Sequence, residues 1–341
     1  NLNMFNNETV RKFLLGKTAI KQFNKHFANM AKERQKSLTK PEGSLGKLED
    51  YAEWMAGWQC KVKPSMDNFH CNVFAANHGV AKLGVSAYPS GVTAQMVENY
   101  KSGGAAINQL CRLGNITLSV IPIELEKPTK DFTKYKAMTE DETISAMQIG
   151  YDSVPNNCDL LILGEMGIAN TSAATAISCA LFNQPIESWT GKGTGISNKI
   201  IQKKISIIKK ALNFHKSKFD KVEQILGTFG GREMAAIAGA VIAARVLGIP
   251  VLLDGFISTA SAATLIIFKN DILDHCLVSH LSSEPGHKGI VSYLNKEPIL
   301  DLNLRLGEGS GGAVAALIIK SALITHNHMK TFSEAQVSEK T

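Results

Sequence analysis

The chain has 341 residues, of which 44% are hydrophobic and 20% are charged. This length and balance are typical of a globular enzyme with a large core, and they exclude a disordered chain, a fibrous chain or a mini-protein. The net charge of +7 is spread along the chain and only 7% of the residues are aromatic, so we expect small anionic ligands rather than nucleic acid.

The cysteines and the hydrophobic segments indicate a soluble protein of the cytoplasm. Six cysteines are scattered without a CxxC pair, a pattern that favours reduced thiols. We expect no signal peptide, because the apolar run at residues 13–15 is too short. The longest apolar stretch, residues 234–256, is interrupted by Arg245, Pro250 and Asp254, and therefore predicts a helix, a turn and a strand rather than a membrane span.

The N-terminal segment is predicted to be helical. The first 36 residues are polar and lysine-rich with apolar positions at roughly helical spacing, so they predict a peripheral helical arm. Residues 38–49 are rich in turn formers: Pro41 and Gly43 favour a turn, and Ser44 is a candidate N-cap for a helix that runs to Trp58.

A recurring unit follows, made of a short apolar strand, a glycine-containing loop and a helix. Strands with continuous apolar character, separated by helices, predict a parallel sheet covered on both faces. The loops that follow these strands should lie at one edge of the sheet, where open α/β sheets bind their ligands. The predicted strands are residues 72–76, 116–122, 159–163, 250–253 and 276–280.

This order of elements predicts an α/β fold, a doubly wound Rossmann-like parallel sheet with a smaller helical domain. We assign residues 70–310 to the large α/β domain that holds the active site. Residues 1–69 and 311–341 are assigned to the smaller helical domain, which includes an apolar helix over residues 313–323 and ends in a polar, frayed tail from Thr325.

The sequence GEGSGG at residues 307–312 follows a strand-like run and precedes the apolar helix. Its glycines let the backbone turn tightly and approach a ligand, and the free N–H groups at a helix N-terminus favour an anion. Glu308 does not suit a loop that only binds phosphate. We therefore predict that its carboxylate takes part in chemistry on a neighbouring group.

Several formal motif matches fail in their context. The GxGxxG spacing at residues 307–312 lacks the second strand and acidic residue of a dinucleotide-binding unit, and its serine lacks the GxSxG spacing of a hydrolase. Residues 191–195 lack the GK[ST] ending of a P-loop. His78, His280 and His287 lie in separate loops without zinc-ligand spacing, so we expect no metal.

The remaining pattern consists of glycine-rich anion-binding loops, lysines, and the loop carboxylates of Glu165 and Glu308. This combination suits a metal-free reaction on a phosphorylated sugar. The general base would be a glutamate that accepts a proton from a neutral N–H or O–H nucleophile.

Longer sequence blocks carry a more specific signal than any single loop. They are KPEGSLGKLE (residues 40–49), ANHGV (76–80), GVSAYPSGVTAQMVENYKSGGAAIN (84–108), GEMGIANTSAA (164–174), GKGTGI (191–196), FGGREMAAIAGA (229–240), LLDGFISTASA (252–262), SHLSSEPGH (279–287) and LDLNLRLGEGSGGA (300–313). In this order, over about residues 38–324, the blocks closely resemble the nicotinate-nucleotide:dimethylbenzimidazole phosphoribosyltransferase family.

The resemblance implies transfer of phosphoribose from nicotinate mononucleotide to 5,6-dimethylbenzimidazole, which gives nicotinate and the α-ribazole 5'-phosphate used for the lower ligand of cobalamin. The leaving pyridinium already carries positive charge, so no cofactor is expected. A nitrogen of the base attacks C1' of the ribose with inversion. In the family, the glutamate of the RLGEGSG motif, here Glu308, accepts the proton that the base loses. A homodimer is also implied.

The resemblance assigns further residues by position. Glu165 is implied as a ribose-side carboxylate, with Met166 and Gly167 in the same loop, while Gly307 and Gly309 would bring the backbone close to the sugar and the base. Phosphate contacts are implied for Gly193, Thr194, Lys204 and Ser282, with Arg305 before the catalytic loop, and an apolar slot for the flat base is implied for Tyr88, Pro89, Gln95 and Met96.

Two alternatives stay open at this point. Some relatives activate other bases, such as adenine or a phenol, and the slot residues do not decide which base is used. A non-catalytic nucleotide-sensing protein could keep the phosphate loops, but it would have no use for the carboxylate of Glu308.

Overall fold

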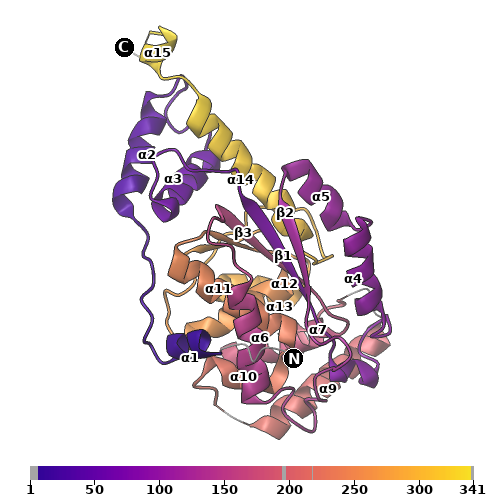
Figure 1. Cartoon of the computed structure of the whole chain (residues 1–341). Coiled ribbons are helices and arrows are strands. Elements are labelled where there is room, and N and C mark those ends of the chain that lie inside the picture. The colour runs from indigo at the N-terminus through magenta and orange to yellow at the C-terminus, as the bar shows by residue number, and fades with distance from the viewer. Residues whose placement is uncertain (1–6, 194–196, 217, 339–341) are drawn as a thin grey trace.

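The computed structural model describes residues 7–193, 197–216 and 218–338. One five-stranded sheet lies at its centre, with the strand order β2-β1-β3-β4-β5. Strands β1, β2 and β3 are labelled in Figure 1. Every neighbouring pair is parallel, so the predicted doubly wound α/β fold is confirmed, as are the five predicted strands. The strands are β1 (Phe69–Ala75), β2 (Thr117–Pro122), β3 (Leu160–Met166), β4 (Val251–Leu253) and β5 (Cys276–Val278).

Helices cover both faces of the sheet (Figure 1). Each face has its own hydrophobic core. The larger core contains residues of α1 (Glu8–Leu14), α6 (Glu140–Asp152), α7 (Asn170–Phe182), α8 (Ile186–Trp189), α9 (Asn198–His215), α10 (Val222–Phe229), α11 (Arg232–Leu247), α12 (Phe256–Ala263), η2 (Thr264–Ile267) and α13 (Pro285–Tyr293). The second core contains residues of α3 (Lys47–Gln59), α4 (Val92–Ser102), α5 (Ala106–Gly114) and α14 (Ser310–His328).

Strand β3 shows how the apolar runs of the sequence serve both cores. Leu161 and Leu163 belong to the larger core, whereas Leu160 and Ile162 belong to the second one. Successive side chains of a strand point to opposite faces, so a strand buried on both sides reads as a nearly continuous apolar run. At the end of β3 this alternation puts Glu165 on the same side as Leu161 and Leu163.

The N-terminal and C-terminal segments meet at one end of the molecule. Helices α2 (Lys25–Ser37) and α3 pack on each other, and α3 packs on α14 (Figure 1). The Arg34 side chain donates to the carbonyl oxygens of His326, Asn327 and Met329. Helix α1 instead packs on α6. The domain boundaries at residues 70 and 310 stay a prediction.

The polar C-terminal segment begins as helix rather than as the frayed tail expected from Thr325. Helix α14 continues to His328, and the short helix α15 (Phe332–Ala335) follows it. Thr331 starts α15 with a capping box, because its hydroxyl oxygen accepts from the Glu334 N–H at 3.1 Å and its own N–H donates to the Glu334 carboxylate at 2.8 Å. Thr331 also forms a β-bridge with Leu38.

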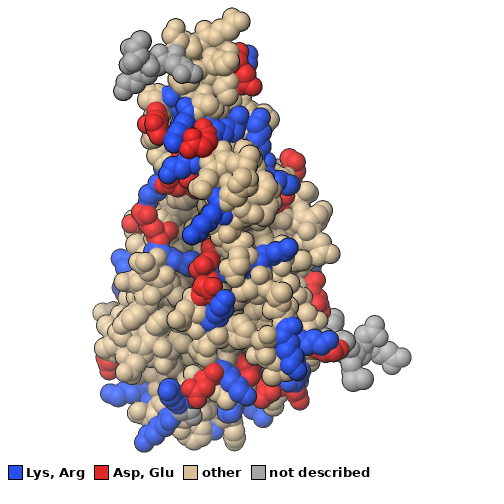
Figure 2. Space-filling model, turned by 90° about the vertical axis from the view of Figure 1, so that its left-hand side faces the viewer, with Lys and Arg blue, Asp and Glu red and all other residues tan. Residues whose placement is uncertain are grey.

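Two surface observations bear on partners. Figure 2 shows basic and acidic side chains interspersed over the face that it draws. No helix among the described residues combines the length and the apolar character needed to cross a membrane. A 3₁₀ helix, η1 (Gly79–Leu83), lies between β1 and α4 in the chain.

Helices α6 and α11 make a close contact through glycines. A Cβ atom added to Gly150 on α6 would lie 1.8 Å from the carbonyl oxygen of Ala236, and one added to Gly239 on α11 would lie 1.8 Å from that of Met147. The two backbones can therefore approach only because both positions lack a side chain.

We predict that Gly150→Ala lowers the free energy of unfolding by about 3 kcal/mol, because the added methyl group must force the two backbones apart. Chemical denaturation followed by circular dichroism measures this change. Gly91→Ala is the matched control, since a Cβ atom at Gly91 meets nothing within 4 Å. Equal stabilities of the two variants would contradict the packing described above.

Candidate active site

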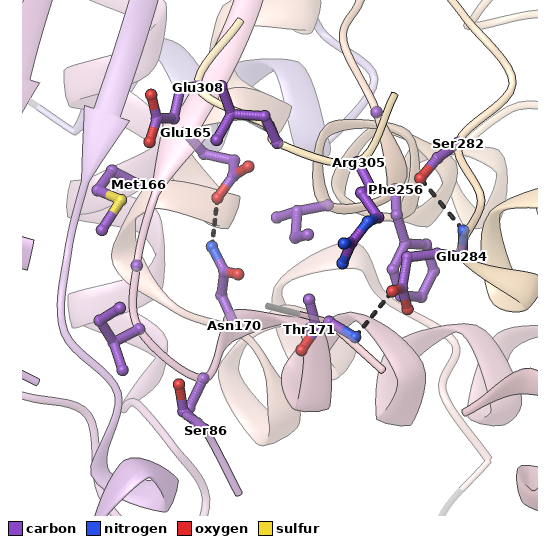
Figure 3. A pocket seen from close by; sticks show the side chains of 18 of the residues that line it. Ser86, Glu165, Met166, Asn170, Thr171, Phe256, Ser282, Glu284, Arg305 and Glu308 are labelled. Atoms are coloured by element: carbon purple, nitrogen blue, oxygen red, sulfur yellow. Dashed lines mark hydrogen bonds between the residues drawn. The ribbon is translucent and has the colours of Figure 1, made fainter. Parts of the chain in front are cut away.

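A cavity of about 440 Å³ lies where the sequence predicts a site, outside the carboxyl ends of the parallel strands (Figure 3). Loops from distant parts of the chain line it. They belong to residues 85–96, 165–171, 192–193, 255–257, 280–284 and 305–308.

The glycine-rich loop enters the cavity in an unusual backbone conformation. Gly307, Glu308 and Gly309 have φ values of +80°, +64° and +81°. The left-handed region costs a residue with a side chain about 1–2 kcal/mol, so Glu308 is held there by its surroundings. The flanking positions require glycine for a second reason. A Cβ atom at Gly307 would lie 2.8 Å from Glu165 Oε1, and one at Gly309 would lie 2.8 Å from Cys71 Sγ.

Asp254 holds this loop in place. It directly follows β4, is 1% exposed, and accepts hydrogen bonds from the backbone N–H groups of Gly309 and Gly312 at 2.9 Å each. His280 Nε2 lies 3.9 Å from Asp254 Oδ1. Burial raises the pKa of Asp254, and His280 and the backbone donors oppose that rise. The start of α14 is thus tied to the carboxyl end of β4.

The Glu308 side chain lines the cavity beside Glu165 (Figure 3). It is 8% exposed. Burial, with a smaller contribution from the charge of Asp254, raises the pKa of Glu308, while the nearby Tyr100 hydroxyl opposes this rise. A carboxylate with a raised pKa is a stronger proton acceptor than one in water.

Glu165 is the second carboxyl group of the cavity. It lies at the end of β3 and accepts a hydrogen bond from Asn170 Nδ2 (Figure 3). Burial raises the pKa of Glu165 to about 8, helped by the charges of Glu233, Asp254 and Glu308 and opposed by the Asn170 hydrogen bond. Glu165 is therefore mostly protonated at neutral pH and can donate a hydrogen bond from its carboxyl group.

The opposite end of the cavity offers groups that suit an anion. Arg305 points into the cavity near Ser282 and Glu284 (Figure 3). The Ser282 hydroxyl oxygen accepts from the Glu284 N–H at 3.3 Å, and Glu284 Oε1 accepts from the Gly193 N–H at 2.8 Å. The Glu284 side chain thereby connects the loop after β5 to the loop before α9.

Lys204 lies behind this end of the cavity rather than in its wall. Its ammonium group is buried and donates to Thr171 Oγ1 at 2.9 Å and to the Gly191 carbonyl oxygen at 3.4 Å. Burial lowers the pKa of Lys204 to about 8, and the charge of Glu284 opposes this decrease. Since Thr171 lines the cavity, the lysine supports its wall from behind.

The structure brings most of the predicted site residues together. Those that line the cavity are Tyr88, Met96, Glu165, Met166, Gly167, Gly193, Ser282, Arg305, Gly307 and Glu308. Pro89, Gln95, Lys204 and Gly309 are not in its wall, and Thr194 is outside the described residues. The roles assigned to all of these residues stay predictions.

Sequence reasoning missed several residues with important contacts. Asp254 follows an apolar strand, and an acidic residue in that place was a usable signal. Asn170, Thr171 and Glu284 lie within sequence blocks that we considered, but their contacts with Glu165, Lys204 and Gly193 depend on the fold. Within the part of the chain that the structure describes, no cluster of three or more histidine, cysteine or acidic side chains is arranged to hold a metal ion.

The fold and the cavity define a class of protein. A doubly wound sheet carries at its carboxyl edge a cavity with buried carboxyl groups at one end and anion-binding groups at the other. This arrangement is that of an α/β enzyme that acts on a small, negatively charged substrate.

Comparison with known sequences specifies the class further. A family model described as phosphoribosyltransferase matches residues 20–337. A protein of Mesorhizobium japonicum named nicotinate-nucleotide–dimethylbenzimidazole phosphoribosyltransferase is 49% identical over 313 residues, which cover 92% of this chain and 93% of the relative. A protein of the same name from Brucella anthropi is 44% identical over 307 residues, covering 90% and 91% of the two chains. The chain belongs to the nicotinate-nucleotide–dimethylbenzimidazole phosphoribosyltransferase family.

Solved structures agree with this assignment. The crystal structure of CobT from Thermus thermophilus has a TM-score of 0.86 and 36% sequence identity, and the match covers 92% of this chain and all of that one. A second structure from the same organism, that of a nicotinate-nucleotide–dimethylbenzimidazole phosphoribosyltransferase, has a TM-score of 0.85 and 34% identity, and the match covers 93% of this chain and all of that one. The fold is therefore shared over nearly the whole chain.

Proposed function

We propose that the chain transfers phosphoribose from nicotinate mononucleotide to 5,6-dimethylbenzimidazole, forming α-ribazole 5'-phosphate and nicotinate for cobalamin biosynthesis. The observation that carries the proposal is the position of Glu308. Its carboxylate is buried, held in a strained loop, and faces a cavity whose other end suits a phosphate group. The names of the relatives support the substrates.

The reaction follows from the charges of its participants. One ring nitrogen of dimethylbenzimidazole attacks C1' of the ribose while the bond between C1' and the pyridinium nitrogen breaks. The bonding electrons return to the pyridine ring, which leaves as nicotinate with a neutral ring. The other nitrogen of the attacking base loses its proton, and Glu308 accepts it. The leaving group is already activated by its charge, so the protein supplies orientation and a base.

The cavity offers matching groups for each part of the substrates. We assign the ribose to Glu165, which can donate a hydrogen bond in its protonated form. The phosphate is assigned to Arg305 and the Ser282 hydroxyl, at the end of the cavity where Gly193 also lies. The flat base is assigned to an apolar wall that contains Tyr88, Val92, Met96, Met166 and Ile168.

Two further properties belong to this proposal. The resemblance implies a homodimer, and the scattered cysteines without a CxxC pair favour a cytoplasmic location. Strand β2 lies at the edge of the sheet with side chains that are exposed or only partly buried, which is compatible with further contacts on that side.

Incubation with nicotinate mononucleotide and a panel of bases tests the substrates. The panel contains dimethylbenzimidazole, adenine and a phenol, and mass spectrometry reads released nicotinate and the riboside product. We expect nicotinate release that depends on dimethylbenzimidazole. Release without any base would indicate a hydrolase, and no release with any base would favour a nucleotide-sensing protein.

We expect Glu308→Gln to lower turnover by roughly 10²–10⁴-fold, the effect of losing a general base. Mononucleotide binding should persist, because the proton acceptor acts on the incoming base. Steady-state kinetics and calorimetry measure the two effects separately. Glu126→Gln, which changes an exposed glutamate outside the cavity, is the control. Normal turnover of Glu308→Gln would refute the assigned role.

Lys204→Met should weaken mononucleotide binding by roughly 10-fold, about 1.4 kcal/mol, because the change removes a positive charge close behind the phosphate end of the cavity and the hydrogen bond that holds Thr171 in its wall. The charged form of Lys204 is lost as the pH rises through about 8. Affinity of the unmodified protein should therefore fall over that range, and the variant should lack this fall. Calorimetry at several pH values provides the measurement. Lys203→Met, on the exposed side of α9, is the matched control, and equal affinities of the two variants would remove Lys204 from the site.

A further inference from the structure

A chain of buried polar side chains extends from Glu165 into the protein interior. Asn170 Nδ2 donates to Glu165 Oε2 and lies 3.4 Å from Glu233 Oε1. The same oxygen of Glu233 pairs with His78 Nε2. Glu165, Asn170, Glu233 and His78 are only 6%, 5%, 0% and 2% exposed. His78 and Glu233 do not line the cavity, so the reaction described above gives them no role.

Four different elements bring these side chains together. Glu165 is the last residue but one of β3, Asn170 starts α7, Glu233 lies in the first turn of α11, and His78 precedes η1. The contacts depend on close approach of the backbone at Gly167, where an added Cβ atom would lie 2.8 Å from Glu233 Oε1 and 3.2 Å from Asn170 Nδ2. The polar chain is therefore a built feature of the fold that links segments far apart in the sequence.

The side-chain amide of Asn170 lies between the two carboxyl groups and can donate a hydrogen bond to each of them. A side-chain amide nitrogen carries two hydrogens, and here one is donated to Glu165 while the other faces Glu233. Both carboxyl groups thus fix the orientation of the amide. Glu165 Oε2 is occupied, and Oε1 is left to face the catalytic loop, 2.8 Å from where a Cβ atom of Gly307 would lie.

The charge of Glu233 is held close behind the cavity. The N-terminal turn of α11 and the donor His78 both stabilise a carboxylate there. Glu233 Oε2 and His78 Nδ1 are buried without a hydrogen-bond partner among the described residues, which is a cost that a purely structural pair would not explain. Other titratable groups around Glu165 and its neighbours are Asp254 after β4, Glu308 in the catalytic loop, Tyr100 on α4 and His280 after β5.

We propose that Glu233, held by His78, is a positioning residue: through Asn170 it fixes the orientation of the Glu165 carboxyl group, and its own nearby charge adds to burial in favouring the protonated form of that group. The proton then sits on Oε1, toward the cavity, because Oε2 accepts from Asn170. The donation of this proton to the ribose rests on the proposed function. The effect of Glu233 on the protonation of Glu165 is independent of the proposed function.

Infrared titration of the free protein tests the protonation directly. The carboxyl signal of Glu165 is obtained by subtracting the spectrum of Glu165→Gln, and its midpoint is compared with and without Glu233→Gln. The glutamine keeps the size and an acceptor oxygen but removes the charge. We expect the midpoint to fall by about one pH unit or more, since loss of a nearby like charge favours ionisation. An unchanged midpoint would overturn the proposal.

A second variant separates this effect from simple loosening of the site. The Asn170 hydrogen bond lowers the pKa of Glu165, so Asn170→Ala should raise the midpoint while Glu233→Gln lowers it. If both variants lowered the midpoint, water entry into a loosened site would be the cause and the proposal would fail. If Glu233→Gln does not fold, the midpoint of Glu165 in Asn170→Ala decides instead. A higher midpoint supports the contact of Asn170 with Glu165 and Glu233, and a lower midpoint rejects it. Ser178→Ala is the control, because the Ser178 hydroxyl bonds only the Ala174 carbonyl within α7.

Kinetic measurements test whether these buried polar side chains affect the reaction. In Glu233→Gln, the limb of the pH profile of kcat that belongs to Glu165 should move to lower pH by the same amount as the infrared midpoint. A limb that does not move, in an active variant, would overturn the positioning role. If the unmodified protein showed no transferase activity, the proposed function would fail, while the infrared result would still decide the role of Glu233.

Discussion

The pair of hydrogen bonds from the Gly309 and Gly312 N–H groups to Asp254 is the contact on which the site depends. It joins the carboxyl end of β4 to the first turn of α14, so the loop that precedes this helix has little freedom. Within that loop Glu308 adopts φ +64°, a conformation that it would abandon if the loop were released. The two hydrogen bonds thus hold a glycine-rich loop, which would otherwise be flexible, in the one conformation that positions the Glu308 carboxylate. Asp254 is suited to this task because its carboxylate can accept from both N–H groups at once, as an apolar residue could not.

The same region has to tolerate several buried carboxyl groups. Glu165, Glu233, Asp254 and Glu308 lie close enough for the charges of the last three to raise the pKa of Glu165. Each has different polar neighbours: backbone N–H groups and His280 for Asp254, His78 for Glu233, the neutral amide of Asn170 for Glu165, and the Tyr100 hydroxyl for Glu308. Because these contacts differ, the four groups need not ionise together. A carboxylate that accepts a proton and a carboxyl group that donates one can then operate side by side in one cavity.

The sheet and Glu308 could be predicted from the sequence for clear physical reasons. Contacts between residues far apart in the sequence could not be predicted. Four of the strands are largely buried on both faces and therefore mainly apolar, and the edge strand β2 is still mostly apolar, so all five could be found from local composition. Glu308 could be singled out because its negative charge does not suit a glycine-rich loop that only binds an anion. Gln95 illustrates the opposite case: it neighbours Met96 in sequence, but successive residues of a helix point about 100° apart, and Gln95 faces outward from α4. Lys204 was expected to contact the phosphate, whereas in the structure it is buried behind Thr171. Helical periodicity cannot tell a lysine that lines the cavity from one that lies behind its wall.

Helix α14 explains why the strained loop can be kept in place. Its first turn is bound by Asp254, and its last turn is bound far away, where Arg34 donates to the carbonyl oxygens of His326 and Asn327, and the His326 ring contacts the Val62 carbonyl oxygen. With 19 residues, α14 is about 28 Å long. Packing along this length against α3, α5 and the sheet resists rotation or sliding of the helix. The N-terminal helices therefore contribute to the site without touching the cavity, because they hold the far end of the element whose first turn positions Glu308.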